Sequence, residues 1–404
     1  MFKRDLAHNL RYYTWYYTLA GCIFTLPIWV AFYTQVITLP QLAIINAFEN
    51  IFSITLEVPT GALADLIGRR TTIFLGKLLE AAMFISMPFA ADFWQILLLT
   101  FIGSIGAALV SGSDSAILYD TLKEQGREVE FGKIYSKLLI HYRAGLIICS
   151  FAGGLLFTVW RGLPYLTRGL FYIASGFAAF LLVEPKLDSK KFTWSKYLTQ
   201  TKQGLVEITR SPFVRKLAAY YIVVAGITYA CIAYFNLPFA YDFGFTPSQM
   251  GYIVAAAYIV SSLIIHWLVT KDGLLTRTRV YLGFPLLLTI ALLPGIFVGR
   301  WLALVLMTLS QVAGSGRFTI LDNYVNQEFS SQNRATALST LNMGVSLCMA
   351  LLIFAGGRIQ GIFDTRHAYT FLGILTLFIV TPLAILLVRE HHRYHAAQAI
   401  IRPH

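Results

Sequence analysis

Long apolar runs separated by short polar turns make up almost the whole chain. A helix needs about 20 mostly apolar residues to cross the hydrocarbon core of a bilayer, and each run has roughly that length. The pattern therefore predicts twelve membrane-spanning helices. We expect them near residues 12–34, 41–63, 71–90, 93–116, 134–157, 165–183, 217–240, 248–269, 280–298, 302–324, 335–357 and 369–388.

The composition excludes an ordinary soluble protein. Hydrophobic residues make up 57% of the 404 residues and charged residues only 13%, whereas about a quarter of a soluble domain is charged. The first apolar run is too long for a signal peptide and lacks a small-residue cleavage site, so we expect it to be retained as a span. The four cysteines lie inside apolar runs without the spacing of a metal site, and we expect no metal and no cofactor.

The basic residues indicate the orientation of the spans. A net charge of +12 would suggest nucleic-acid binding in a soluble protein, but here the Lys and Arg residues sit in turns on the side that carries the termini. Because basic residues mark cytoplasmic loops, we expect a multi-pass protein of the cytoplasmic (inner) membrane, with both termini in the cytoplasm and no nucleic-acid partner. The opposite turns hold Arg161, Arg168, Arg300, Arg358 and Arg366.

A basic stretch divides the spans into two groups of six. Residues 186–216 carry eight Lys and Arg residues interleaved with aromatic and aliphatic ones. This pattern is typical of an amphipathic helix that lies on the anionic inner leaflet. A solvated basic loop is the alternative interpretation.

Short sequence matches relate the two groups of spans. The segment from Gly112 to Asp120 recurs as Gly314 to Asp322, and the sequence FAGG at 151–154 recurs at 354–357. We therefore expect an all-α membrane protein with twelve transmembrane helices in two six-helix bundles, related by a parallel pseudo-two-fold repeat. The predicted parts are an N-terminal bundle (1–185), a cytoplasmic linker with an amphipathic helix (186–216), a C-terminal bundle (217–390) and a cytoplasmic tail (391–404).

The second predicted span carries a polar stripe on one helical face. Because an ionised carboxylate is costly in hydrocarbon, this face must line a water-filled cavity or meet a partner charge. For Glu49, near mid-depth, we expect proton or substrate binding, with a structural ion pair as the alternative. For Glu57, near the inner end, a structural ion pair is favoured. The stripe consists of Asn46, Glu49, Asn50, Ser53, Glu57 and Thr60.

Arg143 lies about ten residues into the fifth predicted span, roughly at mid-membrane. A cation at this depth needs an anion, and Glu49 is the first candidate, followed by Glu80. Such a pair could gate proton exchange, or it could be a permanent bridge that fixes the helix register. Glu80 follows Lys77 by three residues, so we expect these two to pair with each other by default.

Four charged residues lie at the inner ends of the repeat-related spans four and ten. Asp114 and Asp120 belong to the first repeat, and Arg317 and Asp322 belong to the second. Their placement predicts an inner gate.

The turn between spans two and three reads GALADLIGRR, from Gly61 to Arg70. It resembles the signature GxxxDxxGRR of the major facilitator superfamily, with Leu66 where that family usually has a basic residue. The sequences EVPTG and GSDSAILYDTLKE also look like a bacterial branch that contains many drug and metabolite exporters. The resemblance implies a switch that holds the outward-facing state. Its residues would be Gly61, Asp65, Gly68, Arg69 and Arg70.

Together these features predict a transporter and not an enzyme, since the sequence has no nucleophile or metal arrangement at a membrane face. We expect a secondary active transporter that works by alternating access, as a monomer in the bilayer, on a small-molecule substrate. Proton-coupled efflux of an amphipathic or cationic organic compound is favoured. Uptake or facilitated exchange of a small nutrient or metabolite is the alternative, and a lipid flippase or a membrane-embedded enzyme is a remote one.

Overall fold

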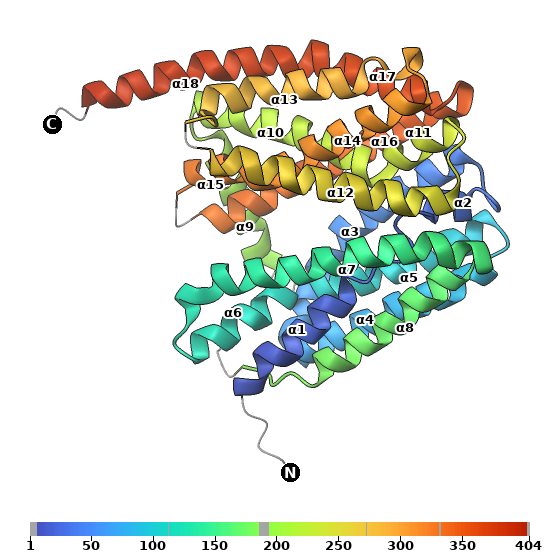
Figure 1. Cartoon of the computed structure of the whole chain (residues 1–404). Coiled ribbons are helices and arrows are strands. Elements are labelled where there is room, and N and C mark those ends of the chain that lie inside the picture. The colour runs from blue at the N-terminus through green and yellow to red at the C-terminus, as the bar shows by residue number, and fades with distance from the viewer. Residues whose placement is uncertain (1–5, 112, 186–193, 272, 331–332, 402–404) are drawn as a thin grey trace. The chain divides into compact units, whose positions relative to one another are not determined.

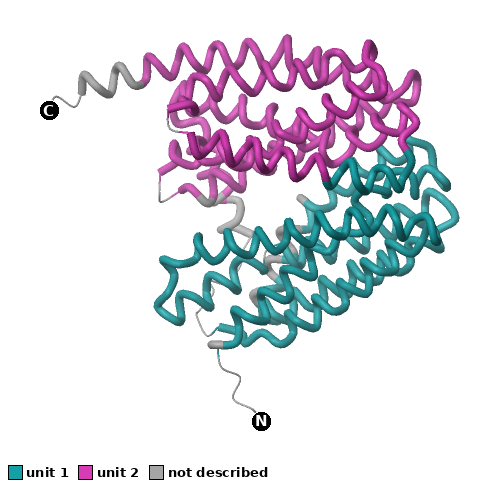
Figure 2. Tube along the Cα trace, in the orientation of Figure 1, with its two compact units in different colours: residues 1–193, 246–255 teal, residues 194–245, 256–404 magenta. Residues whose placement is uncertain are grey.

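The structure is a computed structural model that describes residues 6–111, 113–185, 194–271, 273–330 and 333–401. Every regular element in these ranges is a helix (Figure 1). The chain forms two compact units (Figure 2). Unit 1 comprises residues 1–193 and 246–255, and unit 2 comprises residues 194–245 and 256–404.

Unit 1 is built from the helices of the first half of the chain. Its long helices begin and end within about five residues of the spans expected from the hydrophobic pattern, but a further helix at 114–124 occupies a stretch that was expected to be mostly a polar turn. The elements are η1 (Leu6–His8), α1 (Asn9–Ala20), α2 (Trp29–Tyr33), α3 (Leu39–Ile67), α4 (Arg69–Ser86), η2 (Met87–Phe89), α5 (Phe93–Ser111), α6 (Asp114–Glu124), η3 (Glu128–Glu130), α7 (Phe131–Val159) and α8 (Leu163–Phe180).

Unit 2 contains the helices that follow, and α12 runs from unit 1 into unit 2. The elements are α9 (Trp194–Thr209), α10 (Pro212–Ala230), η4 (Cys231–Phe235), α11 (Asn236–Asp242), α12 (Pro247–Thr270), α13 (Arg277–Leu292), η5 (Gly295–Phe297), α14 (Arg300–Gly316), η6 (Arg317–Leu321), α15 (Asp322–Glu328), α16 (Arg334–Ile362), α17 (Thr365–Leu375), η7 (Thr376–Val380) and α18 (Thr381–Ile401).

Nine helical stretches within the described ranges are long and apolar enough to cross a membrane. The other three predicted spans correspond to α1 with α2, to α3 and to α8. Helix α3 begins with a capping box, in which Thr38 N–H donates to Gln41 Oε1 at 2.9 Å and the Thr38 hydroxyl accepts from Gln41 N–H. Its 29 residues give a length of about 44 Å, more than the hydrocarbon thickness.

Small residues let the helices of unit 1 pack closely. A Cβ atom added to Gly76 of α4 would lie 2.6 Å from the carbonyl oxygen of Gly106 in α5, and the reverse substitution gives the same distance. Any larger side chain at this crossing would push the two backbones apart. Close contact through glycine is the usual way in which membrane helices gain packing energy without a hydrophobic driving force.

The first span is not the continuous helix that its hydrophobicity predicts. Helix α1 ends at Ala20 and α2 begins at Trp29, with an irregular segment between them. Pro27 lies within this segment; it lacks an N–H group and disfavours helical geometry at the residue before it, so an undistorted helix cannot run through to α2. Irregular backbone is tolerated at membrane depth only where protein buries it or where it lines a cavity.

Three long helices of unit 2 each contain one π-helical turn. These turns are η4 after α10, η6 after α14 and η7 after α17. A π-helical turn inserts one extra residue and shifts the side chains that follow, and it often marks a functional position. The turn η6 falls in the repeat-related segment 314–322, while the equivalent residues of unit 1, 115–119, lie in the α-helix α6.

Helix α9 of the predicted linker packs on α16 in unit 2. Gly204 allows the close approach, since a Cβ atom there would lie 2.7 Å from Thr336 O. Glu207 Oε1 accepts from Ser330 N–H at 2.9 Å, and Oε2 accepts from Asn333 Nδ2 at 3.3 Å. Leu205 and Val206 stay exposed. The proposed contact of this linker with the inner leaflet stays a prediction.

The contacts of Glu207 predict a pH-dependent stability. Burial raises the pKa of this carboxyl, but the hydrogen bonds from Ser330 and Asn333 and the charge of Arg210 outweigh it, so that the folded-state pKa is lowered. The stabilisation is therefore complete above the unfolded-state pKa of about 4.3 and is lost as the pH falls through the lower folded-state value. We expect Glu207→Gln to destabilise by about 1.5 kcal/mol at pH 7.

This destabilisation should fade as the medium is acidified, because the wild-type carboxyl then becomes neutral as well. Melting temperatures of wild type and variant, measured side by side in detergent at pH 7 and at progressively lower pH, check this. A difference that stays constant over the whole range would show that the Glu207 charge does not stabilise the docked helix.

Candidate functional site

Arg168 of α8 lies beside the irregular segment that interrupts the first span. Its Nη1 donates to the Thr25 hydroxyl of that segment, and its Nη2 donates to the Tyr172 hydroxyl at 3.0 Å. The guanidinium carbon lies 3.8 Å from the centre of the Phe84 ring. These contacts hold the Arg168 side chain inside unit 1. The hydrophobic pattern instead predicts that Arg168 lies in an outer turn.

Arg168 keeps one unused donor. Its Nε atom is buried and has no hydrogen-bond partner among the described residues. Because a buried guanidinium without an anion is costly, a carboxylate or another acceptor is expected nearby.

Besides Glu80, Arg168 interacts with a second carboxylate, that of Glu49 in α3. Glu49 interacts electrostatically with Arg168 and with the hydroxyl groups of Tyr33 and Tyr165. Its side chain is exposed, and it forms no ion pair within 4 Å in the described part of the chain. Glu49 and Arg168 therefore attract each other without being locked together.

Two other predicted partners of Glu49 are placed differently. Arg143 of α7 is exposed and forms no ion pair with any described residue. Glu80 pairs with Lys77 at 2.6 Å, and the Lys77 ammonium also lies 4.3 Å from the centre of the Tyr172 ring. The self-pairing expected from the spacing of these two residues is thus present, and the pairing of Arg143 with Glu49 stays a prediction.

Three other members of the polar stripe bond to the backbone of their own helix. Asn46 donates to Leu42 O at 3.1 Å, and Asn50 donates to Asn46 O at 2.7 Å. The Thr60 hydroxyl bonds to Leu56 O and reaches Ala108 O of α5 at 3.1 Å. The structure does not describe the side chain of Glu57.

The predicted switch motif surrounds the start of α4. Gly68 has a φ of 87°, which glycine adopts without strain and which allows the sharp turn from α3 into α4. Glu184 caps the new helix, because its two carboxylate oxygens accept from Arg69 N–H at 2.7 Å and Arg70 N–H at 2.9 Å. A carboxylate at a helix N-terminus is favoured by the helix dipole as well.

The two arginine side chains of the motif tie this turn to its neighbours. Arg69 forms an ion pair with Asp120 of α6. Arg70 donates to Leu182 O at 3.3 Å and lies over the Phe180 ring. The structure describes neither the surroundings of Gly61 nor the side chain of Asp65, so their predicted roles in the switch stay predictions.

Asn9 completes this network at the end of α8. Its amide accepts from Val183 N–H at 2.7 Å, donates to Val183 O at 2.8 Å and donates to the Thr121 hydroxyl at 3.0 Å. The helices α1, α4, α6 and α8 are thus joined at one end of unit 1 by side chains that bond to backbone groups and to one another.

The residues predicted for an inner gate fall into separate sets. In unit 1, Asp120 is paired with Arg69, and Asp114 interacts with the Tyr16 hydroxyl. In unit 2, Arg317 is almost fully buried and lies 3.5 Å from Asp322. The Tyr221 hydroxyl bridges this second pair, since it donates to Asp322 Oδ1 at 2.5 Å and accepts from Arg317 Nη1 at 3.0 Å.

Two residues of the candidate site, Arg168 and Glu184, are not predicted from the sequence pattern. Arg168 was assigned to a turn because it stands at the edge of a predicted span, although its spacing of four residues from Tyr172 places both on one helical face. The sequence around Glu184 contains no motif or spacing that predicts a helix cap. Its partners are more than a hundred residues away in the chain, and only folding brings them together.

Comparison with known proteins identifies the family. The model of the Major Facilitator Superfamily matches residues 14–273 and 218–402, which together span nearly the whole chain. The chain belongs to this superfamily.

The curated relatives of this superfamily member include multidrug resistance proteins. The chain is 28% identical over 175 residues to "Multidrug resistance protein MdtH" of Cronobacter sakazakii, and 27% identical over 172 residues to the protein of the same name from Escherichia coli K12. The matched stretch covers 41% of this chain and 40% of each relative. The chain thus spans less than half the length of these relatives, which are consistent with the family assignment.

Solved structures of other transporters share the fold. The nucleoside transporter NupG aligns with a TM-score of 0.73 at 13% identity, covering 95% of this chain and 98% of that one. A bacterial homologue of the human lysosomal transporter Spinster aligns with a TM-score of 0.72 at 15% identity, covering 96% and 98%. This major facilitator protein is therefore an all-α, multi-pass membrane protein of twelve transmembrane helices in two six-helix bundles.

Proposed function

We propose that this transporter exports a small amphipathic or cationic organic compound in exchange for protons, by alternating access. The observation that carries the proposal is the exposed Glu49 carboxylate of α3, which feels the charge of Arg168 but forms no ion pair within 4 Å. The similarity to multidrug resistance proteins supports the export of such compounds.

The exchange follows from competition for one carboxylate. Ionised Glu49 attracts a cationic compound that enters from the cytoplasm. After the protein opens outward, the compound leaves, and a proton from the outside neutralises Glu49. The protonated form then returns and releases its proton inside. A proton and a cationic compound thus occupy the carboxylate in turn, and each leaves before the other binds.

Arg168 contributes by making it easier for the Glu49 carboxyl group to release its proton. Its buried Nε atom offers a donor to Glu49 whenever neither a proton nor a compound is bound. The attraction favours the ionised carboxylate and so promotes release of the proton on the inner side.

Transport under an imposed proton gradient tests the proposal. Proteoliposomes that are one pH unit more acidic inside should accumulate ethidium, a permanent cation, up to about tenfold over the outside if exchange is one to one. A protonophore and protein-free liposomes provide the controls. Accumulation only when the interior is alkaline would indicate uptake with protons, and movement that ignores the gradient would indicate facilitated exchange; either result contradicts the proposal.

A further inference from the structure

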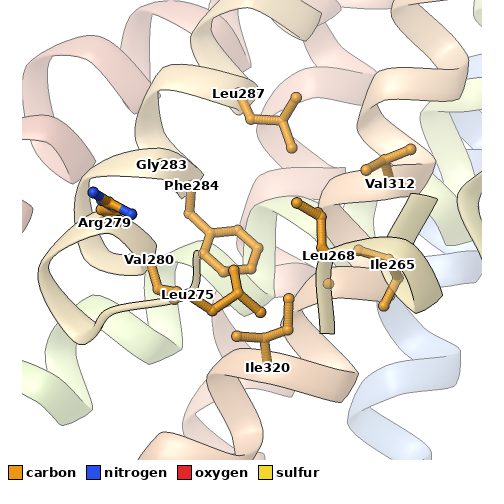
Figure 3. A pocket seen from close by; sticks show the side chains of 11 residues that line it. Ile265, Leu268, Leu275, Arg279, Val280, Gly283, Phe284, Leu287, Val312 and Ile320 are labelled. Atoms are coloured by element: carbon orange, nitrogen blue, oxygen red, sulfur yellow. The ribbon is translucent and has the colours of Figure 1, made fainter. Parts of the chain in front are cut away.

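A pocket of about 200 Å³ lies between α12, α13, α14 and η6 in unit 2 (Figure 3). Its lining is apolar apart from one arginine, and its side chains include Leu268, Phe284, Leu287, Val312 and Ile320. Arg279 and Gly283 are both exposed, so the pocket reaches the surface of the unit at this point. None of the residues assigned to substrate or proton binding takes part in it.

The size and lining of the pocket match a hydrocarbon tail. Sites for drug-sized ligands usually enclose about 300–1,000 Å³ and contain several polar groups, whereas this pocket is smaller and has a single charged side chain. A drug-sized transported compound is too large for this volume. An acyl chain of the surrounding bilayer is narrow enough to enter and has no polar group to satisfy.

The positive charge of Arg279 at the mouth of the pocket favours a lipid with an anionic head group. Arg279 Nη1 donates to Gly273 O at 3.1 Å and to Leu274 O at 3.3 Å, which holds the guanidinium beside the turn between α12 and α13. A guanidinium suits phosphate oxygens geometrically, and the N-terminal end of α13 adds a partial positive charge in the same place.

The neighbouring basic residues reinforce this preference. Lys271 is exposed next to the turn, whereas Arg277 is engaged by Glu328 and Gln327. In the orientation predicted from the basic turns, this rim lies at the cytoplasmic side, where anionic lipids attract Lys and Arg.

We propose that the pocket binds one acyl chain of an anionic phospholipid of the inner leaflet, with the lipid phosphate on Arg279. The chain would pack against Phe284 and Leu287 of α13 and reach Ile320 of η6. This site is independent of the proposed export function, because it involves neither Glu49 nor Arg168.

Gly283 offers a way to fill the pocket without disturbing the fold. A Cβ atom added there meets open space within 4 Å, so a leucine side chain can enter without a backbone clash. Gly132 of α7 in unit 1 is equally open and provides the matched control. Arg279→Gln removes the charge at the mouth and keeps the pocket.

Native mass spectrometry of the full-length protein tests the site. Detergent-solubilised protein is titrated with phosphatidylglycerol and with phosphatidylcholine of the same acyl chains. We expect wild type and Gly132→Leu to retain phosphatidylglycerol in preference to phosphatidylcholine. Arg279→Gln should bind phosphatidylglycerol about fivefold more weakly, and Gly283→Leu should lose one bound lipid.

Three outcomes would overturn the proposal. Unchanged lipid binding by Gly283→Leu would show that no acyl chain enters the pocket. Equal retention of both lipids by wild type, or unchanged affinity of Arg279→Gln, would show that the anionic head is not recognised. Loss of ethidium transport without any change in lipid binding would concern the export function alone, so lipid binding is read from the mass spectra and not from transport.

Discussion

Glu49→Gln is expected to abolish ethidium accumulation driven by a pH gradient, from up to about tenfold to none. Glutamine keeps the size and hydrogen-bonding shape of the side chain but can neither release a proton nor carry a charge. Glu49 is exposed and forms no ion pair within 4 Å among the described residues, so the variant should fold and melt like the wild type. The proteoliposome assay with an acidic interior gives the measurement.

Glu128→Gln serves as the control for this variant, because Glu128 is also exposed but lies in η3, outside the polar stripe of α3. It should transport like the wild type. If Glu49→Gln keeps full gradient-driven accumulation, Glu49 is not the coupling residue. If both variants lose transport, the loss comes from a general effect of charge removal.

The same assay can identify which arginine acts as the partner charge of Glu49. The structure favours Arg168, which interacts electrostatically with Glu49, while the sequence pattern favoured Arg143. We expect Arg168→Gln to impair gradient-driven transport and Arg143→Gln to leave it largely intact. The opposite result would support the pair predicted from the sequence.

Glu184→Ala is expected to have the largest effect on stability. The variant removes both oxygen acceptors that cap the start of α4 and leaves Arg69 N–H and Arg70 N–H without their partner. Since a hydrogen bond to a charged group contributes about 1.5–3 kcal/mol, we expect a loss of about 3 kcal/mol. A lower melting temperature in detergent and faster hydrogen exchange in the first turn of α4 would report it.

The matched control is Glu130→Ala. Glu130 also faces an arginine, Arg127, but both side chains are nearly half exposed, at 46% and 43%. An exposed pair of this kind contributes little, so the melting temperature should hardly move. Equal effects of the two alanine variants would mean that Glu184 acts only as a surface charge and that the helix cap is unimportant.

The Glu184 variant also bears on the switch predicted from GALADLIGRR. The cap, the ion pair of Arg69 with Asp120 and the bonds of Asn9 hold one end of unit 1 together. If this network biases the protein toward one state, its loss should change the transport rate at a fixed gradient as well as the stability. A variant that melts earlier but transports normally would limit the network to a structural role.

The sequence by itself determined the family resemblance, the helical architecture and some of the residues at the two candidate sites, Glu49 and the motif from Gly61 to Arg70 among them. Apolar runs about as long as a bilayer is thick leave little choice of structure, because only helices satisfy their backbone within one segment of this length. The match at Gly61 to Arg70 and the polar stripe around Glu49 follow from local spacing in the same way, since residues on one helical face recur at a fixed interval.

Only the tertiary structure decided which charges meet. The cation near Glu49 is Arg168, which stands 119 positions later in the chain, and the cap of α4 comes from Glu184 beyond the end of α8. The break of the first span between Ala20 and Trp29 also differs from the prediction, because its residues are as apolar as those of a continuous helix and only Pro27 marks it in the sequence. Helical periodicity states which face a residue occupies, but the partner on that face depends on how helices distant in sequence pack together.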